Sequence, residues 1–141
     1  MNDPFLMLLV ESLNLMHPRF AAAHPLHEFY HQFRRLWDKA LPVQLGLGHI
    51  VVQDDPDSPP GSRPDLLIWR IGEGGQPDRR LGAVSLVESA ADLAVLARYK
   101  LGLEYPHAVG IEIGNRGLPP VEGVARIEYD TQKRMAKVRG S

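Results

Sequence analysis

The chain contains no cysteine, and this absence excludes disulfide bridges, thiolate metal sites and cysteine nucleophiles. Charge is nearly balanced, with a formal net charge of −1 at pH 7, so a global electrostatic attraction to nucleic acid is not expected. Long apolar runs are missing as well: the run from Phe5 to Val10 has six residues, whereas a membrane span needs about 20. We therefore expect a cytoplasmic protein without a signal peptide or a membrane segment.

What the chain does contain is typical of a globular protein. Hydrophobic residues make up 44% and charged residues 23% of its 141 residues, which predicts one domain, residues 1–141, with a single core. The 12 Pro and 13 Gly predict many turns. Four of the Pro fall within residues 54–64, so we expect a surface loop there.

Helical spacing marks the first 40 residues. The N-terminal apolar segment, residues 1–16, places apolar side chains at intervals of three and four from residue 4 onward. Leu8 and Leu15 fall outside that stripe, so this helix is apolar on more than one side. It is either buried in the core or forms a surface for a homodimer or a protein partner. A second helix with an apolar face of period 3.6 is predicted at residues 25–40.

The rest of the chain predicts strands and one further helix. Strands are expected at residues 50–52, 66–71, 81–87, 109–113, 124–129 and 135–138, and a helix at residues 89–101. The last two strands should form a hairpin within residues 123–141, and the three strands ahead of the helix an antiparallel meander. Strands 81–87 and 109–113, joined by the helix, should pair in parallel. The predicted fold class is α/β, with a mixed sheet of about five or six strands flanked by helices.

A resemblance arises from the middle of the chain. Pro64 and Asp65 open one predicted strand, and Ser85 and Val87 lie on the next strand, directly before a helix. This order, over residues 25–115, resembles the core of the restriction-endonuclease-like, or PD-(D/E)XK, nuclease family. In that family an Asp on the first strand and a Glu-x-Lys on the second hold a metal ion beside the scissile phosphate. The resemblance implies that Asp65 is the metal ligand and that Ser85 and Val87 occupy the positions of the Glu and the Lys.

Two of the three groups of that site are therefore replaced. Serine supplies no carboxylate and valine cannot activate a nucleophile, so a metal ion held by Asp65 alone should bind weakly. The hypothesis that follows is a catalytically degenerate nuclease-like domain, a binding or structural subunit in a nucleic-acid-associated system, with no cofactor. The alternative is an active Mg²⁺-dependent nuclease in which Asp65 works with a displaced Glu88. Glu28, at the family's auxiliary position, and Lys100, as a displaced Lys, would assist it.

The helix at residues 25–40 also contains a zinc-site pattern. His27-Glu28-Phe29-Tyr30-His31 has the form H-E-x-x-H, in which two His residues share a helix face and the Glu activates a zinc-bound water. This alternative is a zinc metallohydrolase that uses His27 and His31. Six His residues in the chain make a chance pairing more frequent, and only 26 residues precede the motif. We therefore predict that the segment binds no zinc.

Basic residues suggest where nucleic acid could be bound. Residues 126–141 carry five Lys or Arg against two Asp or Glu, a local charge of +3 at the end of the chain. Contacts with the phosphates of DNA or RNA are expected from the following residues: Arg34, Arg35, Lys133, Arg134 and Lys137. Whether they converge on one face depends on the fold.

Overall fold

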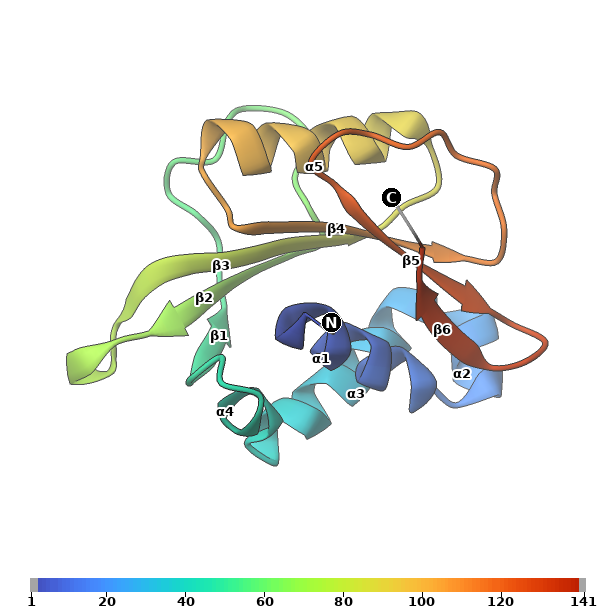
Figure 1. Ribbon diagram of the computed structural model, residues 1–141, viewed down its shortest axis with the longest axis horizontal. Helices are drawn as coiled ribbons and strands as arrows, with labels where there is room; N and C mark the ends of the chain where they lie inside the picture. The colour runs from blue at the N-terminus through green and yellow to red at the C-terminus, as the bar shows by residue number, and fades with distance from the viewer. Residues whose placement is uncertain (1–2, 140–141) are drawn as a thin grey trace.

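Six strands form one mixed sheet in which the strands lie in sequence order (Figure 1). The strands of the computed structural model, which describes residues 3–139, are β1 (Ile50–Val52), β2 (Leu66–Ile71), β3 (Pro77–Leu86), β4 (His107–Ile113), β5 (Ala125–Asp130) and β6 (Met135–Val138). β1, β2 and β3 form the expected antiparallel meander, and β3 pairs in parallel with β4 as predicted. β4 also pairs in parallel with β5, and β5 with β6 forms the expected hairpin. The protein is thus an α/β protein with a six-stranded mixed sheet.

Helices cover both faces of this sheet. Those on one face are α1 (Pro4–Asn14), α2 (Pro18–Ala23), α3 (Pro25–Asp38) and the single turn α4 (Leu41–Gln44), while α5 (Ala90–Gly102) lies alone on the other (Figure 1). A 3-10 turn, η1 (Glu73–Gly75), joins β2 to β3. The core on the α1 side includes Phe5, Leu9, Phe29, Phe33, Ile68 and Ile111. The core under α5 includes Leu67, Ala83, Leu93, Leu96, Tyr99 and Tyr105. None of the helices within residues 3–139 is long and apolar enough to cross a membrane.

The predicted start of β3 is wrong. We expected residues 81–87, whereas the strand begins at Pro77 and its first half is charged and largely exposed. The reason is the pairing with β2, which continues to its last residue and places Pro77 opposite Ile71. Within this extension Arg80 donates from Nε at 2.6 Å and from Nη2 at 3.0 Å to Asp55, whose side chain also accepts from the hydroxyl of Tyr105 at 2.8 Å. The guanidinium holds the pKa of the Asp55 carboxyl below its usual range. This buried network fixes the loop of residues 54–64 to β3, a long-range contact that periodicity cannot register.

Helix α1 is largely a core element. Phe5, Leu8, Leu9 and Leu13 are fully buried, so Leu8 belongs to the core although it lies off the predicted stripe. Leu15, the other off-stripe residue, is exposed at 46%. Residues 1 and 2 of the predicted N-terminal segment, and residues 140 and 141 of the predicted C-terminal hairpin segment, lie outside the described residues.

Two glycines on the central strands allow the helices to approach. A Cβ at Gly82 of β3 would overlap the ring of Phe5, and one at Gly110 of β4 would lie 2.9 Å from Leu93 of α5. A Cβ at either position would be too close to its neighbour for ordinary packing. The helices α1 and α5 therefore reach the sheet because both positions lack a side chain.

We predict that Gly82→Ala lowers the free energy of unfolding by about 1–3 kcal/mol, because the added methyl group must displace Phe5 from a filled core. Urea denaturation followed by circular dichroism measures this. The matched control is Gly102→Ala at the end of α5, where an added Cβ meets no atom within 4 Å and φ is not positive. The control should leave stability unchanged or slightly higher. Equal effects in both variants would contradict the packing described.

Candidate functional site at the carboxyl end of the sheet

A groove lies where the parallel strands end. β3, β4 and β5 run in the same direction, so their carboxyl ends meet at one edge of the sheet, where small ligands bind in many α/β proteins. Two hollows of about 360 and 340 Å³ adjoin there and share Pro25, Leu86 and Glu88. We refer to them together as the carboxyl-edge groove.

The two hollows differ in chemistry. The larger is lined mostly by apolar residues of α2 and of the strand ends, among them Ala21, Ile111 and Tyr129, with Glu88 and Arg116 as its charged residues. The smaller is lined by His24 and His27, which flank the start of α3, together with Asp65 and Glu88. Asp65 and Glu88, predicted from the sequence as candidate metal-binding residues, therefore do lie on one groove.

Hydrogen bonds join Asp65 closely to the end of β3. The register pairs Leu66 with Val84, which places Asp65 beside Ser85. The N–H of Asp65 donates to Ser85 Oγ at 3.0 Å, and the N–H of Leu86 donates to Asp65 Oδ2 at 2.8 Å. One oxygen of the carboxylate is thus occupied by a hydrogen bond that links the start of β2 to the end of β3.

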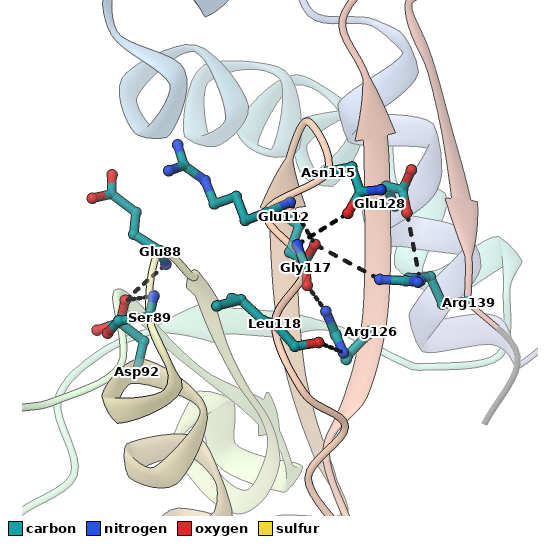
Figure 2. Close-up of polar contacts among 11 residues, drawn as sticks. Glu88, Ser89, Asp92, Glu112, Asn115, Gly117, Leu118, Arg126, Glu128 and Arg139 are labelled. Carbon is teal, nitrogen blue, oxygen red and sulfur yellow. Dashed lines mark hydrogen bonds and ion pairs between the residues drawn. The ribbon is translucent and has the colours of Figure 1, made fainter.

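The charge of Asp65 is unfavourable where it lies. Loss of hydration raises the pKa of its carboxyl above the usual value, and the negative charges of Asp92 and Glu88 raise it further, while the N–H of Leu86 acts in the opposite direction. Asp92 is held at the start of α5, where its Oδ2 accepts from the N–H groups of Glu88 at 2.8 Å and Ser89 at 3.3 Å (Figure 2). The side chain of Glu88 extends away from this cap and is exposed (Figure 2).

Ser85 and Val87, which the resemblance alone assigns to the positions of the Glu and the Lys, are both built into the protein interior. Ser85 is 7% exposed, and its hydroxyl is used by the N–H of Asp65. Val87 is 1% exposed and belongs to the core under α5. Neither position can present a charged group to the groove without disrupting that packing.

The side chains around the groove do not form a zinc site. Within residues 3–139 no group of three or more His, Asp or Glu side chains lies close enough together to hold a metal. A protein zinc site needs at least three such ligands. Asp65 and Glu88 are the two carboxylates among the residues that line the smaller hollow.

The three defining residues of the H-E-x-x-H pattern face different surroundings. Glu28 is 6% exposed and accepts from the N–H of His17 at 2.6 Å and from Nε2 of Gln32 at 3.0 Å, so it ties the start of α2 to α3. It is not among the residues that line the groove. His27 and His31 are both exposed on α3, and only His27 reaches the smaller hollow, beside His24.

The predicted nucleic-acid-binding residues lie in separate places. Arg34 stacks 4.0 Å above the ring of Trp37, and Arg35 donates to Gln32 at 3.1 Å, both on α3. Residues 133, 134 and 137 belong to the β5–β6 hairpin. The end of α3 lies near α4, whereas the turn of the hairpin projects on the opposite side of the molecule (Figure 1). Lys100, the proposed displaced Lys, donates to the carbonyl of Pro106 at 2.9 Å, directly before β4 begins. Asp65 instead lies beside the end of β3, which is parallel to β4, so the two residues are at opposite ends of these strands.

Sequence reasoning missed a buried ion cluster beneath the loop that carries Arg116. Glu112, fully buried in β4, forms an ion pair with Arg126, and Nη1 of Arg126 donates to the carbonyl of Leu118 at 2.7 Å (Figure 2). Arg139 lies 3.8 Å from Glu112 and 3.5 Å from Glu128. A Glu within the apolar run of residues 107–113 was the signal that could have indicated this cluster. Its effect is to hold the loop of residues 114–118 at the rim of the groove.

Comparison of the chain with models of protein families, with curated proteins and with solved structures found no match. A function is therefore inferred from the groove, the strand register and the surface charges of the chain itself.

We predict that Asp65→Asn stabilises the protein at neutral pH. The folded-state pKa of Asp65 is raised, so its ionisation costs stability as pH rises through that pKa, and the cost is absent below the unfolded-state pKa. Asparagine keeps an oxygen that can accept from Leu86 but carries no charge. We expect a gain of up to about 0.5 kcal/mol at pH 7, because solvent screens this exposed residue, and no gain near pH 3.

Urea denaturation at both pH values measures the Asp65→Asn effect. The control is Asp38→Asn, because the Asp38 carboxylate lies 3.8 Å from Arg34. Removal of this favourable charge should lower rather than raise the stability of the protein at pH 7. A loss of stability in Asp65→Asn that is largest at pH 7 would show that the charge is stabilising and would contradict the electrostatics described.

We further predict that protein purified without a His-tag contains less than about one tenth of an equivalent of zinc, because His27 and His31 lack a third ligand among residues 3–139. Elemental analysis by mass spectrometry is the measurement, with His49→Ala as a control for incidental binding. Near-stoichiometric zinc that is lost in His27→Ala would overturn this prediction, since a true site loses most of its affinity with one ligand.

Proposed function

We propose that this chain is a domain with a restriction-endonuclease-like core and a degenerate active site, which serves as a binding or structural subunit in a nucleic-acid-associated system. The order of α3, the meander β1–β3, α5 and β4 supports the core assignment. So does the position of Asp65 at the start of β2, beside the last residues of β3. These are the positions that the family resemblance gives to the metal-binding Asp and to the Glu-x-Lys.

The observation that carries the proposal is the use of the Glu-x-Lys positions for folding. Ser85 accepts the N–H of Asp65, and Val87 fills the core under α5. Phosphodiester cleavage in this family needs carboxylates to hold the metal and a Lys to act on the nucleophile. A single Asp that already accepts a main-chain hydrogen bond supplies neither function in full.

Binding to nucleic acid would then rest on surface charge rather than on the groove. Asp65 and Glu88 give the smaller hollow of the groove a negative charge that repels phosphate. The β5–β6 hairpin instead presents the exposed side chains of Lys133, Arg134 and Lys137. Phosphate contacts through this hairpin would be independent of base sequence and sensitive to salt.

The alternative, an active Mg²⁺-dependent nuclease, is favoured by one observation. Asp65 and Glu88 line the same hollow of about 340 Å³, so two carboxylates face one space. Glu88 would then replace the missing family Glu from a position three residues beyond Ser85.

Incubation with mixed DNA and RNA substrates and Mg²⁺ or Mn²⁺ separates the two functions. We expect no cleavage above the level of an Asp65→Ala control, because Ser85 and Val87 provide no substitute for the missing groups. Cleavage by the unaltered protein that disappears in Asp65→Ala would sink the degenerate assignment and establish the nuclease.

Fluorescence anisotropy with labelled DNA and RNA tests the binding half of the proposal. We expect binding that weakens as salt rises, with a logarithmic slope of about −1 to −3 for one to three phosphate contacts. The double variant Lys133→Glu/Arg134→Glu should lose it, whereas Lys39→Glu, an exposed Lys at the end of α3, should not. Absence of binding, or equal loss in both variants, would contradict a phosphate-binding hairpin.

A further inference from the structure

An uncovered apolar surface lies between α1 and the edge strand β6. Two hollows of about 410 and 800 Å³ share Leu6 of α1 and Val138 of β6. The first hollow also includes Met7 and Val10, and the second includes Leu118 and Val121 of the loop before β5. Met7 is 36% exposed and Val138 is 46% exposed, so large apolar side chains face solvent on both elements. We name this surface, defined by these six residues, the α1–β6 face.

The edge of the sheet narrows the ways in which this face can be covered. Within residues 3–139, β6 is the last strand of the sheet and pairs with β5 alone. An added strand would need the outward main-chain groups of β6, but the N–H of Ala136 already donates to Oδ1 of Asn14 at 2.8 Å. Asn14 thus blocks pairing at the middle of a four-residue strand. Contact through side chains is the mode that remains.

Charges around the first hollow identify an occupant. Asp3 and Glu11 line it from α1, whereas Lys137 lines it from β6. Among the ion pairs formed within residues 3–139, none joins Glu11 to Lys137. A two-fold axis through the apolar floor would place the acidic side of one copy against the basic side of another, so the surface is complementary to itself.

We propose that the α1–β6 face joins two copies of this chain in a two-fold symmetric dimer. Met7 and Val138 pack across the axis, and Glu11 of each copy pairs with Lys137 of the other. The apolar residues at the centre of this face and the charged residues around them match the usual anatomy of a protein interface, which has an apolar core and a polar rim. The dimer does not depend on the nuclease-like assignment. Because Lys137 pairs with Glu11 in it, Lys133 and Arg134 are the hairpin residues that remain for contacts with phosphate.

Sedimentation equilibrium across micromolar concentrations, with Glu11→Lys and Lys137→Glu, tests the pairing. The unaltered protein should be a dimer. Each single variant should raise the dimer dissociation constant roughly tenfold, because two symmetric attractions become repulsions. An equimolar mixture of the two variants should dimerise again, since both ion pairs between the two copies then join opposite charges, one pair in the original sense and one with its charges exchanged.

A second pair of variants guards against a simple folding defect. Met7→Asp places a charge on the apolar floor and should yield monomers with an unchanged circular dichroism spectrum. Leu101→Asp is its matched control, because Leu101 is 77% exposed on α5, on the opposite face of the sheet (Figure 1). An unaltered protein that is monomeric throughout, or a mixture of charge variants that fails to recover the dimer, would overturn the proposal.

Discussion

Two hydrogen bonds between Asp65 and the end of β3 are the contact on which the candidate site depends. The N–H of Asp65 binds Ser85 Oγ, and the N–H of Leu86 binds the Asp65 carboxylate. β3 is the strand at which the sheet changes from antiparallel to parallel pairing. These bonds therefore join the start of β2 to the end of β3, at the edge where the carboxyl-edge groove opens.

The residues around this contact are used for folding. Ser85 contributes a hydrogen bond and Val87 contributes core packing. Asp65 carries an unfavourable charge, offset in part by the N–H of Leu86. Since a fold alone does not establish activity, the chemistry of these three positions decides the functional inference.

Local patterns predicted much of this structure because hydrophobic periodicity depends on which face of an element is buried. The helix from Pro25, the strands around Ile68 and Ile111, and the parallel crossover through α5 all follow from it. The earlier start of β3 was missed because residues 77–80 pair with β2 but are partly or fully exposed and carry no apolar pattern. Glu28 gave no sign of its bond to His17, which depends on the turn between α1 and α2.

The candidate site was predicted only in part for the same reason. Asp65 and Glu88 could be found from strand positions, and they do line one hollow. Arg116 could not, because it reaches the groove on a loop held by the buried pair of Glu112 and Arg126. The sequence also could not show whether the basic residues lie together, because this depends on how α3 and the β5–β6 hairpin are arranged in space.

An NMR titration of the Asp65 carboxyl, with and without millimolar Mg²⁺, tests the central claim most directly. A degenerate site predicts a pKa above the ordinary value for aspartate, because burial and the charges of Asp92 and Glu88 oppose ionisation. The part of this cause that comes from desolvation is a partial loss of hydration, since Asp65 is exposed. A degenerate site also predicts that Mg²⁺ leaves this pKa unchanged. A pKa that falls when Mg²⁺ is added, together with a matching shift at Glu88, would show a shared metal ion and contradict the account.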